Sequence, residues 1–152
     1  MESYHQQINM YKISEVTAKD LSEINELENQ LNLNKTKLIF FNRILLNKNF
    51  KFYKLVLEKQ IIGLLQFSWN KSDCDIISIG VMGKFQNMNF GKKLVEYLKS
   101  FKFKNIYAEV SENNKNALEF YQRLNFKKIG LRNKYYIKQR SNAILLKLEN
   151  FI

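Results

Sequence analysis

The second half of the chain alternates between short apolar runs and amphipathic segments, and this alternation limits the fold more than any other feature. Residues 75–81 and 104–110 read as strands, while residues 90–101 and 114–124 read as helices with one apolar face. Two strands joined through a helix become parallel neighbours in a sheet, because the crossover returns the chain to the same end. The two runs that follow the second helix predict a closing antiparallel hairpin.

The first half favours a meander of strands with two helices near its start. A strand is expected at 13–16, and two more around a turn at Glu58–Gln60. The first helix begins with Thr17 and Asp20 at capping-box spacing, and the second covers 35–47. The residues expected to face the core from these helices are Leu21, Ile24, Leu27 and Leu31, then Leu38, Phe41, Ile44 and Leu45. The element order predicts an α/β chain with a mixed, mostly antiparallel sheet, one parallel pair and flanking helices.

The length and composition fit one folded domain. The 152 residues are 45% hydrophobic, which is enough to build a core. Residues 1–9 are polar and without pattern, so a flexible leader is expected before a single domain over 10–152. No apolar run approaches the roughly 20 residues of a membrane span, and a lone cysteine excludes an internal disulfide. A cytoplasmic protein with no membrane partner is therefore expected.

Charge and residue inventory narrow the chemistry. The formal net charge of +11 favours a polyanionic partner such as nucleic acid, the ribosome or a phosphate-rich cofactor. A compositional bias toward Lys and Asn explains it equally well, and no long basic run indicates specific nucleic-acid binding. His5, the only histidine, lies in the polar leader, and Cys74 lies in a stretch expected to be a loop. Both are interpreted as bystanders, so neither a metal site nor a triad that needs histidine is expected.

The segment Gln86–Gly91 connects a predicted strand to a predicted helix and could hold an anion. A helix start offers free backbone N–H groups and partial positive charge, which suit phosphate. Gly91 permits close approach of a ligand to the backbone, Asn89 tolerates a left-handed conformation, and Lys92 and Lys93 add charge. An ordinary tight turn into a basic surface helix is the alternative.

Two side chains later in the chain could carry proton transfer. In a central strand, Glu109 would point its carboxylate into a largely apolar layer, where desolvation raises a pKa toward that of a general base. A salt-bridged or edge-exposed glutamate is the alternative. Tyr121 lies on the apolar face of the next helix, either as a general acid or as part of the core. Asn114 is expected to cap that helix and could also offer its amide to a ligand.

The stretch "ISIGVMGKFQNMNFGKKL", followed by "EVSENNKNALEFYQRLNFKKIGLRNKYY", resembles the GNAT superfamily of acetyl-CoA-dependent N-acetyltransferases. Within it, the chain resembles the bacterial ribosomal-protein-alanine acetyltransferases most, over roughly Ser78–Leu148. The family's phosphate-binding motif is Gln or Arg, two residues, Gly, one residue, and Gly or Ala. It stands here as Gln86–Gly91, with Asn89 in place of the first glycine. The family's later Leu-Gly-Phe stands as Leu-Asn-Phe, and Asn125 is expected to end the helix in the same left-handed way.

The resemblance implies a GNAT fold, whose parallel pair borders the cofactor cleft, and a role for each matching residue. The backbone of Ile79, Gly80 and Val81 would hold the pantetheine arm of acetyl-CoA like an added strand. Glu109 would be the base that deprotonates the acceptor ammonium, directly or through water. Tyr121 would be the acid that protonates the departing CoA thiolate. The cofactor-binding set is completed by Gln86, Asn87, Met88, Asn89, Phe90, Gly91, Lys92 and Asn114, and it includes Tyr121.

The acceptor end departs from the closest subgroup. Its aromatic-proline-tryptophan segment after the first helix is replaced by "QLNLNKTKLIFF", although Tyr135 and Tyr136 match a tyrosine pair near the acceptor. Glu26 and Glu28 are interpreted first as solvated helix positions, and contact with a basic or N-terminal amine is the alternative. The preferred acceptor is the N-terminal amine of a protein, first of all a ribosomal protein that begins with alanine. A small amine such as a polyamine or amino sugar is one alternative, and a non-catalytic GNAT-like module that binds RNA or protein is another.

Overall fold

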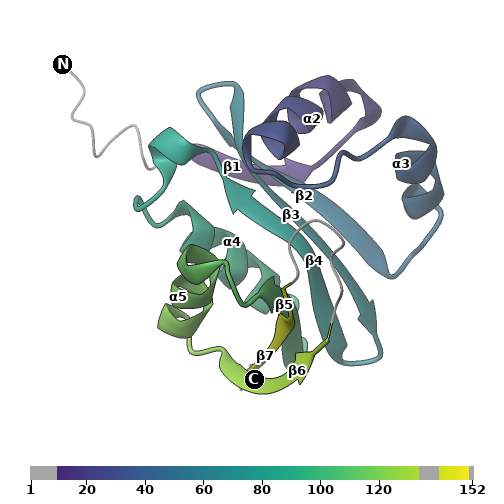
Figure 1. The fold of residues 1–152 in the computed structure, drawn as a ribbon. Coiled ribbons are helices and arrows are strands. Elements are labelled where there is room, and N and C mark those ends of the chain that lie inside the picture. The colour runs from purple at the N-terminus through teal and green to yellow at the C-terminus, as the bar shows by residue number, and fades with distance from the viewer. Residues whose placement is uncertain (1–9, 134–140, 151–152) are drawn as a thin grey trace. The chain divides into compact units, whose positions relative to one another are not determined.

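The computed structural model describes residues 10–133 and 141–150, and it has a mixed α/β architecture (Figure 1). Seven strands are hydrogen-bonded in the order β1-β2-β3-β4-β5-β7-β6. The β4–β5 pair is parallel, while β1–β2, β2–β3, β5–β7 and β6–β7 are antiparallel. The predicted fold class is confirmed.

Each strand and helix expected from the sequence is present, with ends that differ by a few residues. The strands are β1 (Tyr11–Glu15), β2 (Phe50–Leu57), β3 (Gln60–Asn70), β4 (Asp73–Val81), β5 (Asn105–Ser111), β6 (Lys127–Arg132) and β7 (Ala143–Glu149). The helices are α2 (Leu21–Gln30), α3 (Leu38–Leu45), α4 (Phe90–Lys99) and α5 (Lys115–Arg123), with short 3-10 turns η1 (Ala18–Asp20) and η2 (Gly83–Phe85). One assignment is wrong: Cys74 is not in a loop but is a fully buried residue of β4.

The chain divides into two compact units, which are described here one at a time. The first runs to Ser68 and resumes over Ile77–Leu98, and the second takes Trp69–Ile76 and the chain from Lys99 onward. The single domain over 10–152 stays a prediction, and the leader at 1–9 lies outside the described residues.

In the first unit, helices pack on both faces of the strands. Alternate side chains of β2 point to opposite sides: Phe52 belongs to the core under α2 and α3, whereas the Tyr53 ring lies 5.0 Å from that of Tyr97 on α4. The core under α2 and α3 comprises Val16, Leu21, Ile24, Leu27, Phe41, Ile44, Phe50, Phe52, Ile61 and Leu64. The expected capping box is present, since the Thr17 N–H donates to Asp20 Oδ2 at 2.8 Å.

The predicted inner face of α3 is only half correct. Phe41 and Ile44 are buried as expected, but Leu38 is 54% exposed and Leu45 is 64% exposed. A two-turn helix presents only a narrow stripe to the strands, and these two leucines lie to one side of it.

In the second unit, the first residues of β4 pair with β5, and β5 pairs with β7. The parallel β4–β5 ladder runs from Asp73–Asn105 to Asp75–Tyr107. On one face of β5 the side chains of Ile106, Ala108 and Val110 are buried. Helix α5 contributes one buried residue, Tyr121.

Candidate active site

The anion-binding candidate lies in the first unit, between the end of β4 and α4. Asn87 and Asn89 have φ values of 64° and 68°, so both occupy the left-handed region. The expectation for Asn89 is confirmed, while the same conformation at Asn87 was not foreseen. The Gln86 amide nitrogen donates to the carbonyl of Val81 at 2.9 Å, which ties the turn back to β4.

Helix α4 starts from this turn, and the first backbone N–H groups of the helix are free of intrahelical hydrogen bonds. The Lys93 N–H donates to the carbonyl of Asn89 at 3.0 Å, which is the first i to i−4 bond of the helix. The N–H groups before it, in the first turn, have no carbonyl one turn earlier in the helix to bind. The helix start is anchored by Phe90, a buried residue whose ring lies 6.3 Å from Phe85 and 6.0 Å from Tyr11. The segment is therefore a nest of N–H groups on an apolar base, an arrangement that suits phosphate.

Gly80 in β4 is required for space, a property that the sequence alone did not reveal. A Cβ atom at Gly80 would lie 2.6 Å from Leu31 Cδ1 and 3.6 Å from Leu33 Cδ1. Leu31 and Leu33 belong to the segment between α2 and α3. That segment therefore packs directly on β4 at the residues expected to hold the pantetheine arm.

Glu109 does not lie in an apolar layer, so that expectation is wrong. The residue is exposed, and its Oε1 lies 3.0 Å from Nη1 of Arg132 on β6. The reason is that Glu109 points to the opposite face of β5 from its buried residues, and on this face Tyr107 is only half-buried. The alternative interpretation, a glutamate in a salt bridge, fits the observed position of Glu109.

Asp75 is a carboxylate near Glu109 that sequence reasoning missed. It stands opposite Tyr107 in the parallel ladder, which puts it on the same face of the sheet as Glu109. Partial burial, together with the charges of Asp73 and Glu109, raises the pKa of Asp75 above its ordinary value. No sequence pattern marked it, because its position depends on the strand register.

Tyr121 is part of an aromatic cluster in the second unit. The residue is buried, and its ring lies 5.2 Å from Phe120 and 5.0 Å from Phe126. Burial raises the pKa of the Tyr121 phenol, so the hydroxyl keeps its proton at neutral pH. The two ends of α5 are as expected: Asn114 Oδ1 accepts from the Ala117 N–H at 3.1 Å, and Asn125 has a φ of 69°.

Glu28 is not at a solvated helix position. It is 1% exposed, and its two carboxylate oxygens accept from the Thr36 N–H at 3.0 Å and the Thr36 hydroxyl at 2.7 Å. Gln66 on β3 donates to Thr36 Oγ1 at 3.1 Å. This buried network fixes the chain between α2 and α3 to the sheet. Glu26, two residues earlier, is exposed.

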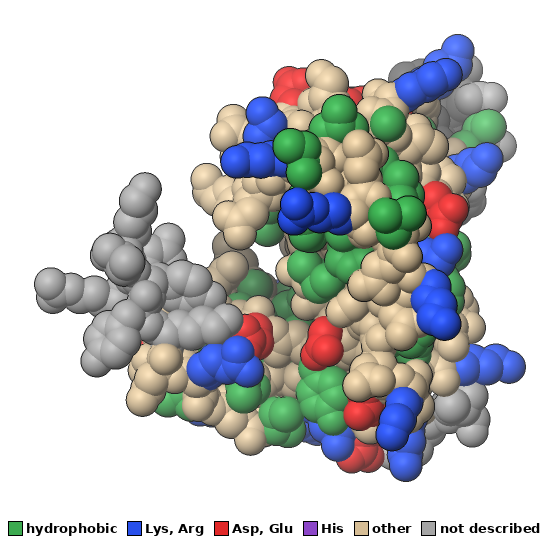
Figure 2. All heavy atoms as spheres, turned by 90° about the vertical axis from the view of Figure 1, so that its right-hand side faces the viewer, with side chains coloured by type: hydrophobic (Ala, Val, Ile, Leu, Met, Phe, Trp, Pro, Cys, Tyr) green, Lys and Arg blue, Asp and Glu red, His purple; other side chains and the backbone are tan. Residues whose placement is uncertain are grey.

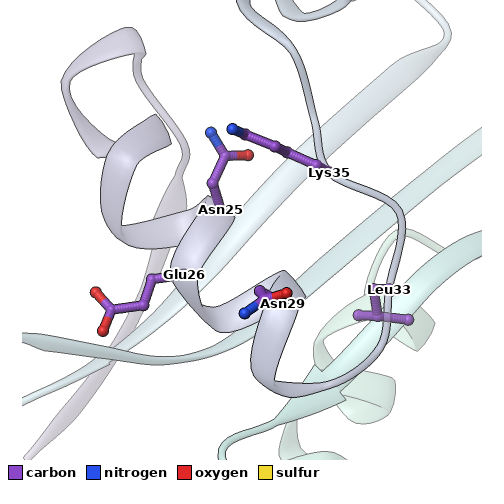
Figure 3. A pocket seen from close by; sticks show the side chains of 5 residues that line it. All are labelled: Asn25, Glu26, Asn29, Leu33 and Lys35. Carbon is purple, nitrogen blue, oxygen red and sulfur yellow. The ribbon is translucent and has the colours of Figure 1, made fainter.

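A cavity of about 300 Å³ opens on the outer side of α2 (Figure 3). Its lining residues are Asn25, Glu26, Asn29, Leu33 and Lys35. The Asn25 Oδ1 atom is buried and has no hydrogen-bond partner in the part of the chain that the structure describes. In Figure 3, Glu26 points away from Asn25 and Lys35, so the lining groups do not converge on one position.

The predicted site residues thus fall into two groups. The first unit holds Ile79–Val81 together with Gln86–Lys92, and the second holds Glu109, Asn114 and Tyr121. Tyr135 and Tyr136 lie outside the described residues. Within residues 10–133 and 141–150, no three His, Cys, Asp or Glu side chains form a group that could hold a metal ion. No helix in these ranges is long and apolar enough to span a membrane.

The profile of the acetyltransferase (GNAT) family matches residues 15–126, which is more than half of the chain. The chain belongs to the acetyltransferase (GNAT) family. Members of this family use acetyl-CoA and an acceptor amine. The resemblance drawn from the turn and the second half is therefore confirmed at the level of the family and its N-acetyltransferase class.

Individual relatives cover more than one kind of acceptor. The chain is 28% identical to N-alpha-acetyltransferase 50 of Danio rerio in an alignment over 108 residues that covers 58% of this chain and 64% of that protein. The ribosomal-protein-S18-alanine N-acetyltransferase of Escherichia coli has a TM-score of 0.81 at 19% identity, over 94% of this chain and 96% of that chain. Spermidine N-acetyltransferase of Vibrio cholerae has a TM-score of 0.77 at 14% identity, over 93% and 95%. Structural likeness at these identities establishes the fold alone.

Proposed function

We propose that this chain is an N-acetyltransferase that moves the acetyl group of acetyl-CoA to the N-terminal amine of a protein. A ribosomal protein that begins with alanine is the first candidate acceptor, and a cytoplasmic location belongs to the proposal. The observation that carries it is the turn before α4. There, Asn89 has the left-handed backbone at the position where the family motif has a glycine.

The residues of the first unit fit the role of acetyl-CoA binding. The N–H groups from Asn87 to Lys92 would donate to the pyrophosphate, where the positive end of α4 adds attraction. The backbone of Ile79, Gly80 and Val81 would pair with the pantetheine arm. When bound, acetyl-CoA supplies a thioester that a neutral amine can attack. In the second unit, Asn114 would add a contact through its amide nitrogen, because its Oδ1 caps α5.

Glu109 and Tyr121 would serve the proton transfers of the reaction: one amine proton goes to Glu109, the thiolate takes one proton from Tyr121, and the second amine proton restores the Tyr121 phenol. At neutral pH the acceptor amine is mainly in its ammonium form, which has no free lone pair to attack the thioester. Glu109 would therefore take one proton from it, directly or through water. Exposure of Glu109 lets water reach the carboxylate, and Arg132 fixes its position. Tyr121 keeps its proton because it is buried, and it would pass that proton to the departing thiolate. The Val81 N–H is the candidate donor to the oxyanion that forms between these steps.

Acetyl transfer read by mass spectrometry tests the proposal. Purified protein and acetyl-CoA are mixed with peptides that begin with Ala, Ser or Met, a blocked peptide with an internal lysine, and spermidine. A gain of one acetyl group on a free peptide N-terminus, greatest for Ala, is the expected result. No transfer to any acceptor, together with no acetyl-CoA binding by calorimetry, would refute the proposal.

Two conservative variants test the assigned roles. Glu109→Gln should lower the rate at neutral pH about 100-fold or more while acetyl-CoA affinity stays the same, because only proton removal is lost. Tyr121→Phe should slow transfer while the melting temperature stays close to that of the parent. A wild-type rate for Glu109→Gln would show that Glu109 is not the base. A wild-type rate for Tyr121→Phe would show that Tyr121 is only a core residue.

A polyamine is the second candidate acceptor, because the fold is also that of a spermidine N-acetyltransferase. The formal net charge of +11 disfavours a polycationic acceptor. Acetylation of spermidine alone in the same panel would move the protein to this class.

A further inference from the structure

Helix α3 is apolar on the side that packs and on the side that does not. Phe41 and Ile44 belong to the core of the first unit. Four other residues, which we call the outer ridge, remain exposed by 54% to 88%: Leu38, Ile39, Leu45 and Leu46. Six of the eight residues of α3 are apolar, the others being Asn42 and Arg43, which is more apolar surface than packing on one side requires.

The outer ridge forms two rows along the helix, and the helical repeat places Asn42 between them. Residues seven apart on a helix differ by only about 20° in direction, so Ile39 lies above Leu46 and Leu38 lies above Leu45. Ile39 is 71% exposed and Leu46 is 88% exposed, and the helical repeat places both opposite the buried Phe41. Single exposed aliphatic residues are common on protein surfaces, but four in one short segment favour an interaction.

The stretch of chain that carries the outer ridge has basic residues and no acidic ones. No Asp or Glu occurs between Glu28 and Glu58. Four basic residues of this segment are exposed and have no ion pair within the described ranges: Lys35, Lys37, Arg43 and Lys48. Two other lysines of the segment are neutralised, by Glu15 and Asp20. The side of Figure 1 on which α3 lies faces the viewer in Figure 2, where hydrophobic side chains gather between Lys and Arg side chains on the upper part, with Asp or Glu side chains at its edges.

The partner must therefore offer both an apolar phase and negative charge. A second copy of the chain would bring like charges together at the ridge, which is unfavourable. Phosphates of RNA would satisfy the basic groups but would leave Ile39 and Leu46 in water. We propose that the outer ridge docks α3 on an anionic lipid bilayer, with its aliphatic side chains among the lipid tails and its basic neighbours at the headgroups. This departs from the expectation of no membrane partner, which rested on the absence of a spanning segment.

Vesicle flotation of the full chain tests the proposal. Wild-type protein should float with vesicles of phosphatidylcholine and phosphatidylglycerol but not with phosphatidylcholine alone. The double variant Ile39→Ser/Leu46→Ser keeps the net charge, so non-specific attraction to anionic lipid is unchanged. We expect its partition coefficient to fall about tenfold or more. The matched control Ile129→Ser/Leu131→Ser removes two residues of β6 that are 53% and 50% exposed, and it should bind like wild type.

Three results would overturn the proposal. The first is a wild-type chain that stays below the anionic vesicles. The second is a double variant that floats as well as wild type, which would leave only the general positive charge. The third is a concentration-dependent dimer that Leu46→Ser abolishes. Such a dimer would show that the outer ridge binds a second copy of the chain. Thermal melting of each variant checks that it is folded, and these side chains are too exposed to support the core.

Discussion

The buried carboxylate of Glu28 gives a stability prediction that needs no assumption about function. Glu28 and Thr36 are joined by two hydrogen bonds, and Thr36 also accepts from Gln66. In Glu28→Gln, one side-chain oxygen can still accept from the Thr36 N–H. The other oxygen becomes an NH₂ group that faces the Thr36 hydroxyl, which is thereby left as a buried donor without an acceptor.

The magnitude follows from this count of donors. One buried donor without a partner costs about 1–2 kcal/mol, so Glu28→Gln should lower the free energy of unfolding by about that amount. For a chain of this length, about 1.5 kcal/mol corresponds to a fall of roughly 3–6 °C in melting temperature. Glu28→Ala leaves both Thr36 donors without an acceptor and adds a cavity, so it should cost about 3–5 kcal/mol.

Thermal and urea unfolding measure the effect, with Glu26→Gln as the matched control. Glu26 is on the same helix but exposed, so its substitution should stay within about 0.5 kcal/mol of wild type. A double-mutant cycle with Thr36→Val should give a coupling of about 1 kcal/mol or more, because each single change disrupts the same contact. Equal melting temperatures for Glu28→Gln and Glu26→Gln would refute the reasoning.

Three further predictions concern Cys74, Asp75 and Gly80. Burial raises the pKa of the Cys74 thiol to about 12. At pH 8 a disulfide reagent should therefore modify the folded protein about a thousandfold more slowly than the chain unfolded in guanidinium, because the thiolate is the reactive form. Equal rates would contradict the burial of Cys74. Asp75→Asn should raise the melting temperature at pH 7 by about 1–2 °C, a small effect because the group is largely solvated. Folding raises the pKa of Asp75 above its ordinary value of 3.8, so the folded state favours the protonated carboxyl, and this contribution to stability is lost as the pH rises through the folded pKa. Near pH 3 the carboxyl is mostly protonated in the folded and the unfolded chain, so Asp75→Asn should no longer raise the melting temperature. An increase in melting temperature that persists at pH 3 would have another cause. Gly80→Ala should cost about 1–3 kcal/mol in unfolding experiments because its methyl group would meet Leu31 at 2.6 Å, and Gly80→Ala/Leu31→Ala should recover part of that loss.

Local chemistry made much of this fold predictable. Thr17 and Asp20 form their capping box because both partners lie within one turn of chain. The same holds for Asn114, which caps α5 from a position fixed by local spacing. Such features need only neighbours in sequence, so they can be recognised before the tertiary structure is known.

The errors concern residues whose surroundings come from distant parts of the chain. Glu109 was expected in an apolar layer because β5 is central, but centrality in a sheet does not decide which face is covered. Cys74 was placed in a loop because polar residues surround it, whereas its pairing with Ile106 makes it part of β4. Glu28 was expected in solvent because only the return of the chain at Thr36 covers it.

The chain also separates two roles that glycine usually combines. None of its glycines has a positive φ, and the left-handed positions are held by Asn, Lys and Glu instead, including Asn87 and Asn89 before α4. Gly80 is kept for space, since Leu31 occupies the volume that a side chain would need. The replacement of the family's first motif glycine by Asn89 therefore matches how this chain fills its other left-handed positions. Asparagine retains the backbone conformation that aims N–H groups at a phosphate, so the altered motif is compatible with acetyl-CoA binding.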